Sequence, residues 1–222
     1  MILVKRFSER SANSDAKFSS CPILILFTKK RTGAYTVNVK RLLFTGGGSA
    51  GHVVPNLAVM QELKNSYDLA YMGTDGLEKK LLADFDCPYF TIDCPKLVRS
   101  FTPKNLTIPY RLARAQRAAL EVVKREKFDL VFSKGGYVSY PAVSAAHRLN
   151  VPVLTHESDL SPGLCTRIIA AKCNYVLTSF PETATKFRNG KYVGSPIRED
   201  VLHGERSAAR HKYGFFGDKP VL

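Results

Sequence analysis

The chain has 222 residues, of which 45% are hydrophobic and 23% are charged, which is the balance of a globular protein with a buried core. Lys and Arg number 33 against 19 Asp and Glu, and the formal charge of +14 predicts an anionic partner: nucleic acid, a phosphorylated ligand or an acidic membrane surface. No apolar stretch reaches the ~20 residues of a membrane-spanning helix, which excludes an integral membrane protein of that kind.

Two segments hold much of the positive charge. Residues 1–40 carry a net charge of +6, and their apolar run Cys21–Phe27 is followed by Lys-Lys-Arg, an order unlike that of a secretory signal peptide. We therefore predict a poorly ordered basic leader over residues 1–39. Residues 91–127 also carry +6 but lie inside the folded pattern, so they are the better candidate for an anion-binding surface. The five cysteines form no CxxC pair, which favours reduced, mostly buried thiols over disulfides or a metal site.

Short apolar runs alternate with segments of helical spacing from Lys40 onward. Strands are predicted at Arg41–Phe44, Leu69–Met72, Tyr89–Ile92, Leu130–Phe132, Val151–Thr155 and Tyr175–Leu177. Helices are predicted at Pro55–Lys64, Leu77–Phe85, Leu106–Lys124, Val138–Leu149 and Pro162–Ala171. Buried strands that alternate with helices are typical of a parallel sheet covered on both faces. The sequence therefore predicts a Rossmann-like, doubly wound α/β domain over residues 40–198.

The alternating pattern stops after residue 198. Residues 199–214 are polar and charged, and Lys219–Leu222 has the composition of the first residues of another strand. We expect residues 199–222 to be an interdomain linker and the start of a second domain.

Four loops of the predicted sheet contain glycine, hydroxyl groups, histidine or charge. They are Gly46–His52, Ser133–Tyr137, His156–Asp159 and Gly194–Arg198. Right-handed crossovers place the loops that follow parallel strands along one edge of the sheet, where ligands of this fold bind. We therefore expect the functional site at this edge.

The first of these loops has the spacing Gly46-x-Gly48-x-x-Gly51 between a strand and a helix, which satisfies a dinucleotide fingerprint. The backbone can approach a phosphate closely at glycine, and the first helical N–H groups attract an anion. The alternative is a tight turn without a ligand. Asp75 could hold a ribose after the second strand, which keeps an NAD(P)-dependent oxidoreductase open as a further alternative.

Several side chains of this edge have both a chemical and a structural interpretation. His52 could act as a general base at neutral pH, or it could bond to the neighbouring loop. Lys134 could reach a phosphate or lie on the surface. His156 and Glu157 are better interpreted as a buried pair that braces adjacent loops. Arg198 could clamp a phosphate or carboxylate, or form a salt bridge across the domain boundary.

Three segments of this edge, taken together, resemble a known family. FTGGGSAGHVVPNLAV, SKGGYVSYPAVSAAHRLNVPVLTHESDLSPGLCTRIIA and KYVGSPIRED are similar, in order and in spacing, to the MurG family of UDP-N-acetylglucosamine:lipid I N-acetylglucosaminyltransferases. The resemblance covers about residues 40–200. It implies the N-terminal half of a GT-B glycosyltransferase fold, in which two Rossmann-like halves face each other across a cleft.

The resemblance also implies the reaction and its partners. The N-terminal half would receive the undecaprenyl-diphosphate-linked MurNAc-pentapeptide, the C-terminal half would hold most of the UDP-GlcNAc, and GlcNAc transfer with inversion would convert lipid I to lipid II in peptidoglycan synthesis. No cofactor and no catalytic metal are implied. The enzyme would work peripherally at the cytoplasmic face of the cell membrane, where residues 91–127 would meet anionic lipid. Charge alone, without a recognition motif, does not support nucleic-acid binding.

Residue by residue, the family pattern implies roles for named positions. His52 falls on the candidate catalytic base, and ligand contacts are implied for Ser49, Ala50, Gly51, Asp159 and Arg198. Supporting or acceptor-binding roles fall on Gly47, Gly48, Lys134, Gly135, Gly136, Tyr137, His156 and Glu157. The chain departs from the family at two positions, because Ala50 adds a methyl group in the loop and Asp159 replaces a common Asn.

Activity of the fragment alone is not expected from this resemblance, because the donor-binding half would be needed. An alternative is an acceptor-binding subunit that works with a separate donor-binding chain, as in the split transferase of eukaryotic N-glycan assembly.

Overall fold

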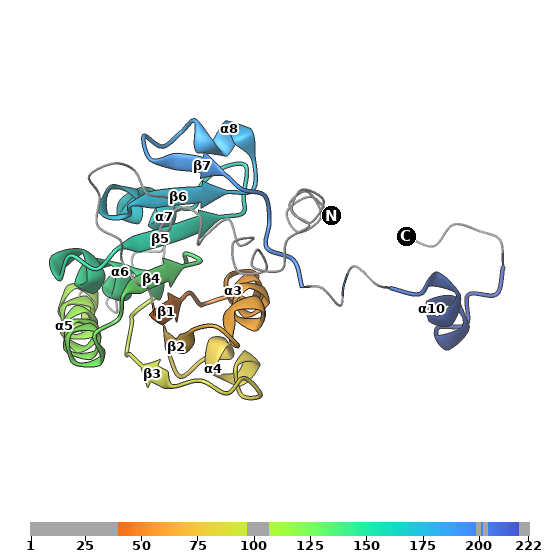
Figure 1. Cartoon of the computed structure of the whole chain (residues 1–222), viewed down its shortest axis with the longest axis horizontal. Helices are drawn as coiled ribbons and strands as arrows, with labels where there is room; N and C mark the ends of the chain where they lie inside the picture. The colour runs from red at the N-terminus through yellow and green to blue at the C-terminus, as the bar shows by residue number, and fades with distance from the viewer. Residues whose placement is uncertain (1–39, 97–106, 199–200, 202–203, 218–222) are drawn as a thin grey trace, which may run out of the picture.

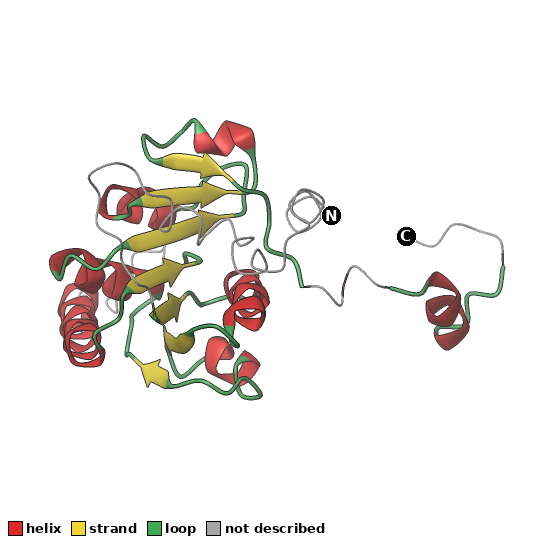
Figure 2. Cartoon of the chain, in the orientation of Figure 1, coloured by secondary structure: helices red, strands yellow, loops and turns green. Residues whose placement is uncertain are grey.

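A computed structural model describes residues 40–96, 107–198, 201 and 204–217 of the chain. Within them a seven-stranded, wholly parallel sheet has the order β3-β2-β1-β4-β5-β6-β7, shown in yellow in Figure 2. The strands are β1 Arg41–Thr45, β2 Asp68–Gly73, β3 Tyr89–Thr91, β4 Leu130–Ser133, β5 Val153–Glu157, β6 Tyr175–Thr178 and β7 Gly190–Tyr192. The predicted Rossmann-like α/β fold is confirmed.

Helices cover both faces of the sheet (Figure 1). On one face lie α3 (Ala50–Leu63) and α4 (Leu77–Leu81), and on the other lie α5 (Ile108–Glu126), α6 (Ser139–Arg148) and α7 (Leu164–Ile169). The remaining helical segments are η2 Ala170–Lys172, α8 Pro181–Ala184 and α10 Arg206–Lys212. No side chain of α10 is buried.

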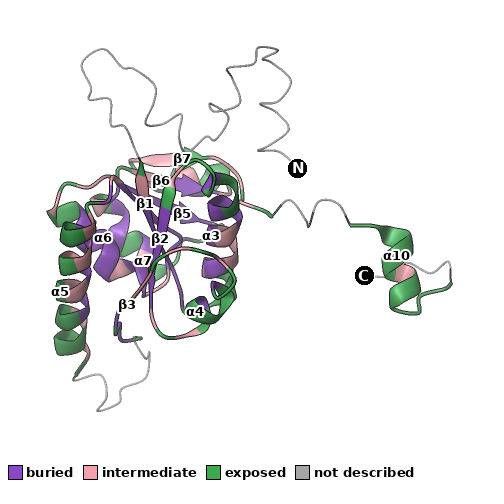
Figure 3. Cartoon of the chain, turned by 60° about the horizontal axis from the view of Figure 1, so that its bottom comes forward, coloured by how far each residue is buried: buried purple, intermediate pink, exposed green. Residues whose placement is uncertain are grey.

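The alternation of side chains along each strand divides the core into two layers. In β1, Leu43 packs into the layer under α5 and α6, whereas Leu42 and Phe44 pack into the layer under α3. Helix α5 buries only Ala115, Ala119 and Val123, one narrow stripe at intervals of four residues. Figure 3 shows this stripe in purple against an exposed outer face. Such a narrow apolar face suits a helix on the outside of a sheet domain.

Element boundaries differ from the prediction in several places, and three of them concern the sheet or its carboxyl edge. Helix α3 begins at Ala50 rather than Pro55, so Pro55 lies inside the helix and the turn after β1 is shortened. Strand β5 runs on to Glu157, although residues 156–159 were predicted as a loop. The short strand β7 was not predicted, because its sequence GKY offers no apolar alternation to recognise. Residues 1–39, the predicted basic leader, lie outside the described residues.

The strand order indicates where on the sheet a ligand site is expected. Successive connections move in one direction from β1 through β2 to β3, and in the opposite direction from β4 onward. The order therefore reverses between β1 and β4, and the loops after these two strands lie side by side at the carboxyl edge. In open α/β sheets, ligands bind at this switch point.

Candidate functional site

The loops after β1 and β4 touch each other through glycine. Gly136 has a φ of 77°, and a Cβ atom there would collide with the carbonyl oxygen of Gly47. Gly48 has a φ of 82°, and its Cβ would lie 2.6 Å from the ring atom Cε1 of Tyr137. A side chain at either position would strain the backbone and separate the loops. These glycines therefore fix how closely the two loops approach.

A buried polar network holds the first loop from below. The Tyr71 hydroxyl donates to the carbonyl oxygen of Gly46 at 2.7 Å, and Asn56 Nδ2 donates to the carbonyl oxygen of Thr45 at 3.1 Å. The carboxylate of Glu78, which is 1% exposed, accepts hydrogen bonds from the backbone N–H of Gly48 in this loop at 3.4 Å and from that of Thr74 after β2 at 2.8 Å. Burial raises the pKa of Tyr71, which keeps its hydroxyl a donor.

Sequence reasoning missed Asn56, Tyr71 and Glu78 as supporting residues. Asn56 lies on the buried face of α3 and Glu78 on that of α4, where each interrupts an apolar pattern. A polar residue at a predicted core position is the signal that could have found them, because buried polar groups need hydrogen-bond partners.

The start of α3 faces this edge and has no acidic side chain of its own. Ser49 is the N-cap residue, but its side chain makes no capping hydrogen bond, and the first turn contains no acidic residue. Ser49, Ala50 and Gly51 are all exposed. The unpaired N–H groups and partial positive charge of a 14-residue helix are therefore available to an anionic ligand.

His52 lies in the first turn of α3, partly buried against the β4 loop. Its Nδ1 lies 3.2 Å from the carbonyl oxygen of Lys134. A carbonyl oxygen can only accept, so Nδ1 carries the proton and Nε2 keeps its lone pair in the neutral ring. Burial and the charge of Lys134 lower the pKa of His52, outweighing the Lys134 carbonyl bond and the opposing charges of Glu157 and Asp159. The neutral form with a free Nε2 lone pair is therefore favoured at neutral pH.

Lys134 is not the surface lysine of the alternative interpretation. The residue is 3% exposed, and its backbone N–H donates to the carbonyl oxygen of Thr45 at 2.9 Å. Burial lowers the pKa of its ammonium group, while the charges of Glu157 and Asp159 act in the opposite direction. Lys134 therefore sits at the electrostatic centre of the loops after β1, β4 and β5.

His156 and Glu157 are the last two residues of β5 and are buried, which corrects their prediction as loop residues. His156 Nε2 donates to the carbonyl oxygen of Gly194 at 2.8 Å, and its buried Nδ1 has no partner among the described residues. Burial, followed by the charge of Lys134, lowers the pKa of His156 to about 4. His156 is therefore a neutral residue that ties β5 to the segment after β7.

Glu157 organises the loop between β5 and α7. Its Oε1 accepts from the N–H of Asp159 at 3.0 Å, and its Oε2 accepts from the N–H of Gly163 at 3.0 Å. Burial acts to raise the pKa of Glu157, but hydrogen bonds from Thr166 and from these two N–H groups, together with Lys134, hold it below its usual value. The carboxylate is thus ionised and fully used within the protein.

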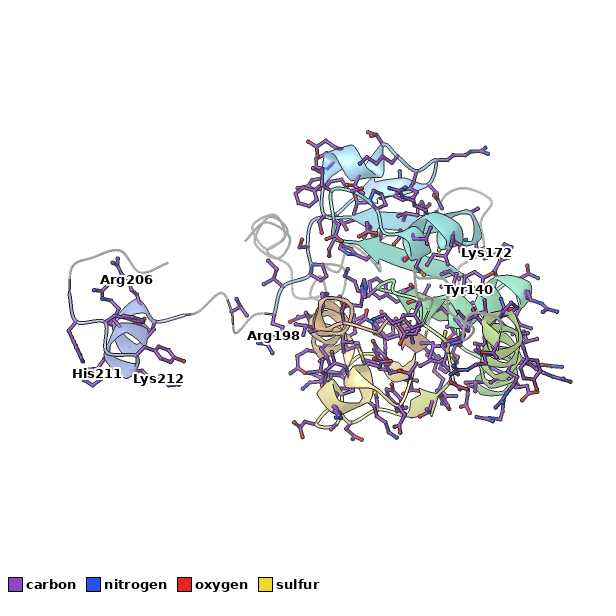
Figure 4. The ribbon with its side chains drawn as sticks, turned by 180° about the vertical axis from the view of Figure 1, so that it is seen from behind. Tyr140, Lys172, Arg198, Arg206, His211 and Lys212 are labelled. Carbon is purple, nitrogen blue, oxygen red and sulfur yellow. The ribbon has the colours of Figure 1, made fainter. Side chains whose placement is uncertain are left out.

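The remaining residues implied by the resemblance are more peripheral. Asp159 is exposed, although its charge reaches His52 and Lys134. Arg198 is exposed on the segment that leaves the sheet beyond β7, toward α10 (Figure 4). Asp75, the ribose candidate of the oxidoreductase alternative, pairs with Lys79 at 2.6 Å. The structure thus brings His52, Lys134 and Asp159 into one electrostatic group and leaves Arg198 at its margin.

Other features of the described residues bear on the chemistry. In them, no cluster of three or more His, Cys, Asp or Glu side chains could hold a metal ion. Nor is any helix of the described part long and apolar enough to cross a membrane. Four described cysteines are free thiols, and Cys165 Sγ donates to the carbonyl oxygen of Gly136 at 2.9 Å.

Comparison with known proteins identifies the family of the domain. Residues 42–178 match the glycosyltransferase family 28 N-terminal domain. A UDP-N-acetylglucosamine--N-acetylmuramyl-(pentapeptide) pyrophosphoryl-undecaprenol N-acetylglucosamine transferase of Clostridium botulinum is 42% identical over 188 residues, which are 83% of this chain and 53% of that protein. A protein of the same name from Clostridium perfringens is 41% identical over 82% of this chain and 52% of its own length. The chain therefore spans about half the length of the curated relatives it matches.

Solved structures agree on the fold. The crystal structure of Acinetobacter baumannii MurG superposes with a TM-score of 0.59 at 28% identity, over 73% of this chain and 47% of that one. Anabaena HepE in complex with UDP-glucose superposes with a TM-score of 0.53 at 17% identity, over 78% of this chain and 50% of its own. The second likeness concerns the fold alone.

Proposed function

Because the chain belongs to glycosyltransferase family 28, we propose that it is the acceptor-binding half of an inverting N-acetylglucosaminyltransferase. The reaction would transfer GlcNAc from UDP-GlcNAc to undecaprenyl-diphosphate-linked MurNAc-pentapeptide, which makes lipid II from lipid I in peptidoglycan synthesis. The names and the 41–42% identity of the clostridial relatives support this substrate pair.

The geometry of His52 carries the proposal. Its Nδ1 donates to the Lys134 carbonyl oxygen, so Nε2 can take the proton of an acceptor hydroxyl. The freed hydroxyl oxygen would attack the anomeric carbon of the sugar, and the bond from that carbon to the UDP oxygen would break as the new bond forms on the opposite face. A neutral imidazole is the form that this step needs, and burial favours it.

The start of α3 would receive the diphosphate of the acceptor. Its free N–H groups, its lack of an acidic first-turn residue and the nearby Lys134 all favour an anion there. UDP-sugar would be held mainly by the second half of the complete enzyme, with Asp159 and Arg198 at the boundary. Both residues are exposed, which suits contact with a ligand or a domain beyond this one.

The outer face of α5 would lie against the membrane. Arg114, Arg117 and Lys124 are exposed on it, and each basic residue near an anionic leaflet contributes about 1 kcal/mol. Arg111 is exposed as well and pairs with Asp93 at 2.6 Å. Residues 97–106 of the basic cluster lie outside the described residues. The enzyme would thus act as a peripheral protein at the cytoplasmic face of the cell membrane.

A binding experiment on this chain tests the acceptor site. The variants Gly51→Asp and Gly51→Asn have the same shape, and a Cβ at position 51 meets only Ser49 Oγ, at 3.8 Å. The Asp variant places a negative charge in the first turn of α3. We expect it to bind vesicles that contain the lipid-linked acceptor about tenfold more weakly than the Asn variant, because the charge repels the diphosphate.

Three vesicle compositions separate the contributions. Neutral vesicles with and without the acceptor report the diphosphate site, and vesicles with anionic lipid but no acceptor report the surface of α5. Equal acceptor binding by the two variants would refute the site at α3. Equal binding of the unchanged chain to neutral and anionic vesicles would refute the membrane surface and leave the acceptor site standing.

A further inference from the structure

The backbone of Lys134 contacts His52. A lysine that only binds phosphate through its side chain would not need this contact. The carbonyl oxygen of Lys134 lies 3.2 Å from His52 Nδ1. Its own backbone N–H is fixed at 2.9 Å to the carbonyl oxygen of Thr45, the last residue of β1. The carbonyl that orients the imidazole is therefore held by the sheet itself.

Lys134 is buried beside the loop that leads from β1 to α3. A Cβ built on Gly46 in this loop would lie 3.2 Å from Lys134 Cβ. The residue is 3% exposed, and none of the ion pairs formed by the described residues includes it. A buried cation without a carboxylate in contact exerts a stronger field on its neighbours than a paired, solvated one.

The charged groups around His52 come from three elements. Lys134 follows β4, Glu157 ends β5 and Asp159 lies in the loop before α7. The positive end of α3 adds its partial charge to that of Lys134. Of the three side chains, Lys134 affects His52 most strongly, and it acts in the opposite direction to the two carboxylates.

We propose that Lys134 is the positioning residue of His52: its carbonyl oxygen orients the imidazole, and its buried ammonium group keeps the ring in the neutral form. This inference rests on the proposed function, in which neutral His52 accepts the acceptor proton. Lys134 then has no contact with the reacting atoms and acts through His52.

An NMR titration of this chain tests the proposal. The Cε1–H signal of His52, assigned by its loss in His52→Gln, is followed against pH in the unchanged chain and in Lys134→Met. We expect the midpoint of His52 to move to higher pH in Lys134→Met, because the buried positive charge is gone while the side-chain volume is kept. An unchanged midpoint in a folded variant would overturn the proposal.

The matched control is Lys172→Met. Lys172 ends η2 and is labelled on the far side of the domain from Arg198 in Figure 4, and it is not among the groups that affect the pKa of His52. This variant removes the same charge at a distance, so the midpoint of His52 should not change. An equal shift in both variants would mean that net charge alone moves the titration, and it too would overturn the proposal.

Two measurements on the unchanged chain keep the test valid if Lys134→Met does not fold. Nitrogen chemical shifts of His52 should report a proton on Nδ1, and a proton on Nε2 would contradict the carbonyl contact. The Lys134 ammonium signal should titrate below the ordinary lysine range. A titration at the ordinary value would place the group in solvent and overturn the proposal.

A kinetic arm separates this inference from the proposed function. Residues 40–198 replace the matching segment of the full-length Clostridium botulinum relative, and lipid II formation is measured against pH. Lys134→Met should move the acidic limb of kcat/KM to higher pH without changing KM for UDP-GlcNAc. If His52→Ala instead retained near-normal turnover, the role of His52 as base would be wrong, whereas the coupling seen by NMR would stand.

Discussion

The β1–β4 loop pair and the carboxyl end of β5 lie at the same edge of the sheet, but different forces hold them. Steric contact fixes the first, because Gly136 and Gly47 approach so closely that no side chain fits between them. Ionisable groups hold the second, because Glu157 accepts two backbone N–H bonds and His156 ties β5 to Gly194.

This difference bears on two properties of His52, its orientation and its charge. The contact between Gly136 and Gly47 contains no titratable group, so the approach of the two loops should depend less on pH than the β5 region does, although the buried Glu78 carboxylate also bonds to the first loop. The β5 region depends on the charge of His156 and Glu157 and therefore responds to acid. The orientation of His52 thus depends on the region that is less sensitive to pH, and its charge is set in part by the more sensitive one.

Gly136→Ala should have the largest effect on stability, because a methyl group does not fit at the contact between the two loops. Its φ of 77° is unfavourable for alanine, and the new methyl group would meet the backbone of Gly47 and the ring of His52. We expect a loss of about 2–5 kcal/mol in the free energy of unfolding, from left-handed backbone strain and overpacking together. Chemical denaturation monitored by circular dichroism measures it.

The matched control is Gly163→Ala in the β5 region. Gly163 has a φ of −63°, and a Cβ there meets only Glu157 Oε2, at 3.8 Å. This substitution should change the free energy of unfolding by less than about 0.5 kcal/mol, as surface substitutions usually do. Equal losses of unfolding free energy in the two variants would show that the close glycine contact is not what sets the β1–β4 loop pair apart from the β5 region.

The second-largest effect should come from acid, which destabilises the β5 region. The pKa of His156 is about 4 in the folded chain, below the 6.5 of an unperturbed histidine. Between these values the unfolded chain binds a proton that the folded chain does not, so stability falls as pH drops below about 6.5. From pH 7 to pH 5 we expect this residue to cost about 2 kcal/mol in the free energy of unfolding.

The comparison variant for this effect is His156→Gln. Its amide nitrogen can still donate to the carbonyl oxygen of Gly194, but it does not titrate. The variant should therefore lose less stability than the unchanged chain between pH 7 and pH 5. Glu157 does not confuse the result, because its lowered pKa removes stability only below its usual value of 4.5. Identical pH profiles would contradict the assignment to His156.

The sequence predicted the fold and its ligand edge more fully than the site. Six of the seven strands followed from apolar runs such as Leu42–Phe44, whose burial is a local property of composition, whereas the strand order came from the structure. The positions of Gly136 and His52 at one edge followed from the rule for parallel sheets. Pattern alone was enough for the strands and for this edge.

Pattern suggested the burial of His156 and Glu157 but could not supply that of Lys134 or Glu78. Lys134 follows an apolar strand and precedes two glycines, a context that suits a surface lysine as well as an enclosed one. It is buried where its loop meets the loop after β1, which is distant in sequence. The same reason hid Glu78, whose carboxylate serves a loop that lies thirty residues earlier in the chain.

Asp159→Asn should have the smallest effect on stability and still sharpen the comparison. The side chain is exposed, and its backbone N–H, which donates to Glu157, is kept. We expect a change of less than about 0.5 kcal/mol in the free energy of unfolding.

The negative charge of Asp159 raises the pKa of His52. Asp159→Asn should therefore lower that pKa, whereas Lys134→Met should raise it. NMR titration measures the shift, with exposed Asp84→Asn as the control that should leave His52 unchanged. An unchanged pKa of His52 in Asp159→Asn would mean that the charge of Asp159 does not reach His52, and the electrostatic link between the two regions would be lost.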